Sequence, residues 1–144
     1  QVVIAGETQA VHAAIDACKA AGAKRAVLLD VSGPFHSSLM ERAADDFSEA
    51  LSVIELTLPE IPVYQNVHGQ VADSVDEMRR LLVEQLYSPV RWTACVSALL
   101  GAGVAQFVEC GPGNVLAGLV KRISRGTPTV GLATADGIEA ALAL

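Results

Sequence analysis

The sequence has few aromatic residues, few charged residues and three cysteines, and each shortage excludes a class of protein. Aromatic residues make up 4% and charged residues 18% of the 144 residues, whereas hydrophobic residues make up 51%. Disordered chains combine low hydrophobicity with high net charge, so this composition predicts a folded domain with an aliphatic core. Cys18, Cys95 and Cys110 are odd in number and far apart. This spacing argues against disulfides and against a metal site, and it favours the reducing cytoplasm.

Basic residues are also scarce, with 10 Lys and Arg against 16 Asp and Glu and a net charge of −6. A nucleic-acid-binding protein normally carries a basic patch, so we expect no nucleic-acid partner. The longest uncharged stretch, residues 92–108, is interrupted by Gly101 and Gly103 and is a poor candidate to span a membrane. The chain opens with Gln1 inside an apolar run, without Met or a signal pattern. We therefore expect a piece of a longer protein.

Hydrophobic periodicity and turn residues predict strands alternating with helices, which is typical of an α/β fold with a parallel sheet. Thr8 is the expected N-cap of a first helix and Gly22 its C-terminal glycine, while Ser74 opens a capping box. Pro89 is expected in the first turn of another helix. The expected strands are residues 2–5, 26–31, 63–67, 104–110 and 129–132, and the expected helices are 8–21, 38–52, 74–86, 89–101, 114–124 and 138–144.

His36 is the histidine with the most promising surroundings for chemistry. It lies directly after an expected strand and before an expected helix, and functional groups of α/β sheets gather at the carboxyl ends of strands. The dipole of a helix N-terminus would disfavour the imidazolium and keep the ring a neutral base. A structural role for this histidine is the alternative. No serine lies in a Gly-x-Ser-x-Gly turn, so a nucleophile for His36 would belong to chain outside these residues.

Two further patterns have ordinary structural explanations. Residues 111–113 (Gly-Pro-Gly) lie between a strand and a helix, but Leu116 stands where a dinucleotide-binding fingerprint needs glycine. A tight structural turn is the favoured interpretation. Lys121, Arg122 and Arg125 gather at the end of the following helix, where cations complement its dipole. A solvated helix face is the first interpretation of these cations, and docking of an acidic partner is the second.

Four stretches in order resemble the bacterial malonyl-CoA:acyl-carrier-protein transacylase family. They are residues 1–6 (Gln-Val-Val-Ile-Ala-Gly), 32–40 (Ser-Gly-Pro-Phe-His-Ser-Ser-Leu-Met), 85–92 (Gln-Leu-Tyr-Ser-Pro-Val-Arg-Trp) and 109–119 (Glu-Cys-Gly-Pro-Gly-Asn-Val-Leu-Ala-Gly-Leu). The resemblance implies an enzyme about twice this length. Residues 1–32 would end a small ferredoxin-like subdomain, and residues 33–144 would form the C-terminal part of a large α/β-hydrolase-like subdomain.

The same resemblance implies the chemistry. An elbow serine upstream of Gln1 would take the malonyl group from malonyl-CoA and pass it to the phosphopantetheine thiol of acyl carrier protein. His36 would be the general base and acid, oriented by the main-chain carbonyl of Gln85, and Phe35 would exclude an α-branched acyl group. The arginine that binds the malonyl carboxylate would also lie upstream. No cofactor and no metal is implied.

Two alternatives to a discrete transacylase stay open at this point. One is an acyltransferase domain of a polyketide synthase, and the other is a non-catalytic module of the same fold that docks carrier proteins. The expected partners are the N-terminal half of the enzyme, the carrier protein and malonyl-CoA. Lys121, Arg122 and Arg125 are candidates for the carrier-protein surface because carrier proteins are acidic.

Overall fold

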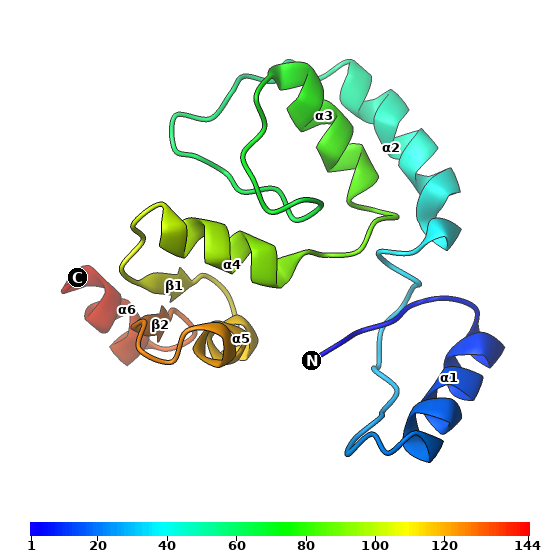
Figure 1. Ribbon diagram of the computed structural model, residues 1–144. Coiled ribbons are helices and arrows are strands. Elements are labelled where there is room, and N and C mark those ends of the chain that lie inside the picture. Colours follow the sequence, from blue (N-terminus) through cyan, green and yellow to red (C-terminus); the bar gives the residue numbers. More distant parts are fainter. The chain divides into compact units, whose positions relative to one another are not determined.

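The computed structural model describes all 144 residues and contains both helices and strands, as expected for the α/β class (Figure 1). It forms two compact units: a first unit of Gln1–Val67 with Val71–Val90, and a second unit of His68–Gln70 with Arg91–Leu144. No helix is long and apolar enough to cross a bilayer. The elements in chain order are α1 (Thr8–Ala20), the short 3₁₀ helix η1 (Ser38–Met40), α2 (Glu41–Ser52), α3 (Val75–Glu84), α4 (Trp92–Gly101), β1 (Phe107–Glu109), α5 (Val115–Ile123), β2 (Thr129–Gly131) and α6 (Ala135–Leu142).

Helix α1 confirms one of the two predicted boundaries. Gly22 adopts a φ of 90°, and its N–H donates to Lys19 O while that of Ala23 donates to Cys18 O. These two bonds form a Schellman motif, which requires the left-handed conformation that glycine adopts at little cost. The N-terminal prediction was wrong, because Thr8 is the first helical residue and Glu7 is the N-cap, without a side-chain capping bond.

The three strands expected in the first unit do not form. Residues 2–5 and 26–31 have no strand structure, and in segment 63–67 only Tyr64 forms an isolated antiparallel bridge, to Val71. A strand is stable only when a neighbour takes up its N–H and C=O groups, and no neighbouring strand is present in this chain. Both N-terminal segments instead expose apolar side chains: Val2, Val3, Ile4, Val27, Leu28, Leu29 and Val31.

Helices α2 and α3 pack side by side and form the core of the first unit (Figure 1). The buried side chains on these two helices are Ala44, Leu51, Met78 and Leu81, and Leu81 is 1% exposed. Burial of one leucine side chain contributes about 1.5–3 kcal/mol.

Arg79 adds a polar link between the two helices, since its guanidinium donates to Leu51 O and to Ile54 O, the latter at 2.9 Å. Leu51 O also accepts from the Ile54 N–H at 3.2 Å, so the guanidinium adds a further hydrogen bond at the end of α2.

The predicted capping box at the start of α3 is present in modified form. Ser74 Oγ accepts from the Glu77 N–H at 3.1 Å, as in the standard motif. The Glu77 carboxylate accepts from the N–H of Asp73, one residue before the N-cap, at 2.8 Å. Acidic Asp76 and Glu77 also complement the positive end of the helix dipole. The other end of α3, capped by Gln85, is part of the candidate site.

The second unit is built around a parallel pair of strands, which confirms the predicted sheet type. Strands β1 and β2 pair in register from Phe107 opposite Thr129 to Glu109 opposite Gly131, with α5 connecting them (Figure 1). Helix α5 also contacts α4, and α6 contacts β2. The buried apolar side chains are Cys95, Val96, Ala117 and Val120. The predicted helix start at Pro89 was wrong, because α4 begins at Trp92.

Candidate active site

His36 lies in the turn that leads from the N-terminal segments into η1. Its φ of 63° is in the left-handed region, which His tolerates better than most non-glycine residues but which still costs on the order of 1 kcal/mol. Two hydrogen bonds hold the turn: the His36 N–H donates to Leu86 O at 2.9 Å, and Ser37 Oγ donates to Pro34 O at 2.6 Å. The ring itself is exposed. Backbone strain held in this way is typical of functional positions.

The imidazole of His36 is oriented by the main chain at the end of α3. Its Nδ1 lies 2.7 Å from the carbonyl oxygen of Gln85. Because a carbonyl can only accept, Nδ1 is the donor and the neutral ring carries its proton there. The lone pair of Nε2 is then available to accept a proton. This is the tautomer that a general base needs.

Pro89 explains why the Gln85 carbonyl is available to the histidine. A helical carbonyl accepts from the N–H four residues later, and for Gln85 that residue is Pro89, which has no N–H. The preceding carbonyl, Glu84 O, accepts a hydrogen bond from the Ser88 N–H at 3.0 Å. The carbonyls of Gln85 and Leu86 therefore lie beyond the helical hydrogen bonds and accept from His36 instead.

The hydrogen bond of the His36 ring adds an electrostatic influence that the sequence pattern does not indicate. The sequence predicts that His36 lies at the N-terminus of the following helix, where the helix dipole disfavours the imidazolium. Its ring also bonds to the C-terminal end of α3, where the helix carries a partial negative charge. Nδ1–H can donate to the Gln85 carbonyl both in the neutral ring and in the imidazolium.

Phe35, the predicted specificity residue, precedes His36 in the same turn. Its side chain is 47% exposed and its ring covers Gly33, so that a Cβ at position 33 would lie 3.3 Å from ring carbons. Glycine at 33 therefore lets the ring lie close to the turn. Lys121, Arg122 and Arg125 are exposed and belong to the second unit, at the end of α5 and just after it.

The Gly-Pro-Gly turn before α5 has the features of a structural element. Gly111 and Gly113 have φ values of 143° and 83°, which only glycine adopts readily. The Glu109 carboxylate, 9% exposed, accepts from the N–H groups of Leu116 and Ala117 at 3.0 and 2.8 Å. It occupies the amides that would otherwise bind an anion at this helix N-terminus. Sequence reasoning missed this residue, because nothing in the local pattern shows that a strand-end carboxylate turns onto the next helix.

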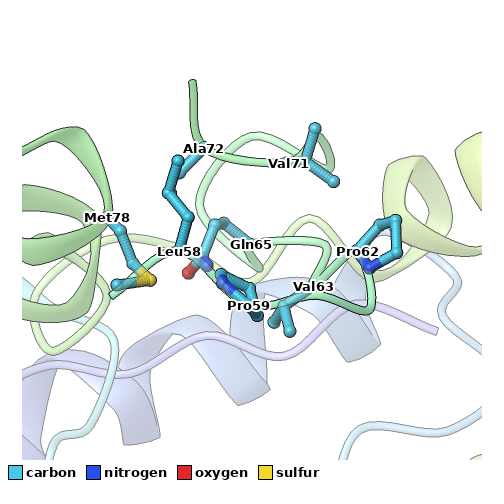
Figure 2. Close-up of a pocket in the computed structure, with 8 residues that line it drawn as sticks. All are labelled: Leu58, Pro59, Pro62, Val63, Gln65, Val71, Ala72 and Met78. Carbon is cyan, nitrogen blue, oxygen red and sulfur yellow. The ribbon is translucent and has the colours of Figure 1, made fainter. Parts of the chain in front are cut away.

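The first unit also contains a small apolar pocket that His36 does not line (Figure 2). Its volume is about 170 Å³, and its walls include Leu58, Pro59, Val63, Val71 and Met78, with the buried amide of Gln65 between them (Figure 2). It contains none of the predicted site residues. Cys95 offers no alternative nucleophile, because burial raises the pKa of its thiol and so disfavours the reactive thiolate.

Comparison with known sequences identifies the family. The profile of the acyl transferase domain matches residues 1–139. The chain belongs to the acyl transferase domain family. The malonyl CoA-acyl carrier protein transacylase of Bacillus subtilis is 42% identical over 142 residues, which cover 99% of this chain and 45% of the relative. The chain therefore spans less than half the length of this curated acyltransferase.

Solved acyl transferase structures agree with the sequence comparison. The malonyl-CoA:acyl carrier protein transacylase of Xanthomonas oryzae matches with a TM-score of 0.92 and 43% identity, over 96% of this chain and 44% of that chain. A malonyl-transacylase in complex with its type II polyketide synthase acyl-carrier protein matches with a TM-score of 0.91 and 46% identity, over 96% of this chain and 45% of that chain. The resemblance inferred from the four motifs is confirmed at the level of the family.

Proposed function

We propose that this acyl transferase segment supplies the general base of a malonyl transferase, which moves malonyl from malonyl-CoA to the phosphopantetheine thiol of acyl carrier protein. The observation that carries the proposal is the 2.7 Å contact between His36 Nδ1 and Gln85 O, which leaves Nε2 free to take a proton. The names of the matched relatives support malonyl-CoA as donor and the carrier protein as acceptor. The complex of a similar transacylase with its carrier protein supports the same partner.

In the proposed first half-reaction, a serine hydroxyl on chain outside these residues attacks the thioester carbonyl of malonyl-CoA. Nε2 of His36 accepts the serine proton, and the imidazolium that forms lies against the negative end of α3. When the tetrahedral intermediate collapses, the C–S bond breaks. The leaving thiolate of coenzyme A takes the proton back from Nε2, and malonyl remains as a serine ester.

The second half-reaction reverses these roles. Nε2 of His36 accepts the proton of the phosphopantetheine thiol, and the sulfur attacks the malonyl-serine ester. The C–O bond then breaks, and the serine oxygen recovers its proton from the imidazolium. A neutral carbonyl in place of a carboxylate partner suits this chemistry, because a thiolate leaves without strong acid assistance. No cofactor or metal takes part in the proposed cycle.

We further propose that residues 1–32 end a small ferredoxin-like subdomain and that residues 33–144 complete a large α/β-hydrolase-like one. The upstream half would supply the elbow serine and the arginine for the malonyl carboxylate. The exposed apolar segments 2–4 and 27–31 support this proposal, since contiguous apolar surface marks an interface. Val2, for example, is 89% exposed.

A transfer assay with the full-length protein tests the proposed function. The purified protein is mixed with malonyl-CoA and carrier protein bearing phosphopantetheine, and the intact mass of the carrier is followed. We expect the carrier to gain one malonyl group as free coenzyme A appears. A full-length protein that binds the carrier without transferring malonyl would instead be a docking module of the same fold.

We predict that Phe35→Ser in the full-length enzyme raises the use of methylmalonyl-CoA relative to malonyl-CoA by about 10-fold or more. The phenyl ring beside the base leaves little room for an α-methyl group, and a fit of this kind is worth roughly 1–3 kcal/mol. The measurement is the ratio of kcat/KM for the two donors. Phe35→Leu, which keeps much of the bulk, is the matched control. An unchanged ratio in Phe35→Ser would disprove the steric account.

We predict that reversing Lys121, Arg122 and Arg125 to Glu weakens carrier-protein binding and flattens its dependence on salt. Opposite charges steer association mainly through its rate, and salt screens that attraction. The measurement is the affinity for the carrier protein over a series of salt concentrations.

The control for this prediction reverses three exposed cations of the first unit, Lys19, Lys24 and Arg42, so that the net charge changes equally. If the control variant loses as much affinity as the test variant, total charge rather than this cluster governs binding.

A further inference from the structure

The side chain of Gln85 is held at both ends of its amide, although only its main-chain oxygen touches His36. Gln85 Nε2 donates to Leu82 O at 3.2 Å, and Gln85 Oε1 accepts from Asn66 Nδ2 at 3.0 Å. The orientation of both amides follows from this arrangement. Leu82 O can only accept, so Nε2 must face it, and Asn66 must then present its N–H to Oε1.

The hydrogen bonds of Gln85 are of two kinds, because some stay within α3 and one joins α3 to a separate segment. The Gln85 N–H donates to Leu81 O at 3.0 Å, and the bond to Leu82 O also stays within the last turn of α3. Both would move with the turn if the helix end frayed, as helix ends do. The bond from Asn66 comes from a separate segment, 19 residues earlier, and ties the end of α3 to it.

We infer that Asn66 is a positioning residue for His36. By holding the side chain of Gln85, it keeps the main-chain carbonyl of Gln85 directed at Nδ1 and so preserves the tautomer in which Nε2 is the base. This inference rests on the proposed function and adds a residue to its machinery. Asn66 touches no reacting atom and acts through Gln85 alone. Pro89 leaves the Gln85 carbonyl without a helical donor, and Asn66 determines where that carbonyl points.

The test uses the full-length enzyme with Asn66→Asp, Gln85→Ala and the double variant. Aspartate has the same shape but no N–H to donate, and alanine removes the side chain that Asn66 holds while keeping the carbonyl. We expect each single variant to lower kcat for malonyl transfer about tenfold with little change in KM, because misplacement of a base affects the chemical step. We expect kcat of the double variant to fall about tenfold as well, because both changes break the same hydrogen bond between the side chains of Asn66 and Gln85. Losses that multiply to about 100-fold, or an Asn66→Asp variant as active as the wild type, would overturn the inference.

A second measurement separates this inference from the proposed function. The nitrogen resonances of His36 report the fraction of the ring protonated on Nδ1 and require no turnover. We expect this fraction to fall in Asn66→Asp and to stay unchanged in Gln9→Glu, which makes a similar amide-to-acid change on the exposed face of α1. An unchanged tautomer in Asn66→Asp would overturn the inference even if transfer by the wild type is established. If His36→Ala retains full transfer, the proposed function fails, while the tautomer result still tests Asn66.

Discussion

Replacing His36 with alanine in the full-length enzyme should lower the rate of acyl-enzyme formation by about 10²–10⁴-fold, the usual contribution of a general base. Without Nε2, nothing accepts the serine proton as the hydroxyl attacks, and nothing returns it to the leaving thiolate. The measurement is the burst of coenzyme A released from malonyl-CoA before the carrier protein is added. The binding of malonyl-CoA should change little, because the ring is not among the groups proposed to hold the donor.

Two further variants separate chemistry from backbone strain. Asparagine also tolerates the left-handed conformation seen at φ 63°, so His36→Asn should preserve the turn better than His36→Ala while losing the base equally. His12, exposed on α1, gives the matched histidine-to-alanine control and should keep the full burst. A burst of normal rate and amplitude in His36→Ala would remove this histidine from the catalytic role.

The second large effect concerns the 144 residues on their own. We expect the isolated chain neither to acquire a malonyl group from malonyl-CoA nor to transfer one to carrier protein, because it would hold a base without its nucleophile. We also expect it to unfold without a sharp transition, since segments 2–4 and 27–31 expose apolar side chains that find no partner in the chain. Intact mass after incubation with malonyl-CoA and a thermal unfolding curve provide the measurements.

A complementation experiment provides the control for this second prediction. The remaining upstream half, added as a separate chain or produced together with this one, should restore both transfer and cooperative unfolding. Restoration should fail when this segment carries His36→Ala. Malonyl transfer by the isolated chain at a rate close to that of the full-length enzyme would contradict the division of the site between two halves.

The elements that sequence predicted best are those set by local physics. All six expected helices form near their expected positions, because apolar spacing and end signals such as Gly22 and Ser74 act within a few residues. Strands β1 and β2 form because α5 brings them together within the chain. Segments 2–5 and 26–31 have strand-like composition, yet composition alone cannot supply the neighbouring strand that the pairing requires.

The candidate site was only partly predictable for the same reason. The position of His36 between an expected strand and an expected helix predicts a functional role. Only the family resemblance, and no local pattern, predicts a role for Gln85. Pro89 was visible four residues after Gln85, where it was expected to start a helix; in the structure it follows α3, and α4 begins three residues later. The roles of Asn66 and Glu109 depend on contacts between separate elements, and spacing along the chain does not reveal such contacts.

The position of the malonyl group on the acylated enzyme tests the central claim most directly. The full-length protein is loaded with malonyl-CoA in the absence of carrier protein, digested, and its peptides are mapped by mass spectrometry. The account predicts a malonyl ester on a serine outside these 144 residues, formed rapidly with His36 present and slowly in His36→Ala. A malonyl group attached to any residue from Gln1 to Leu144 would contradict it.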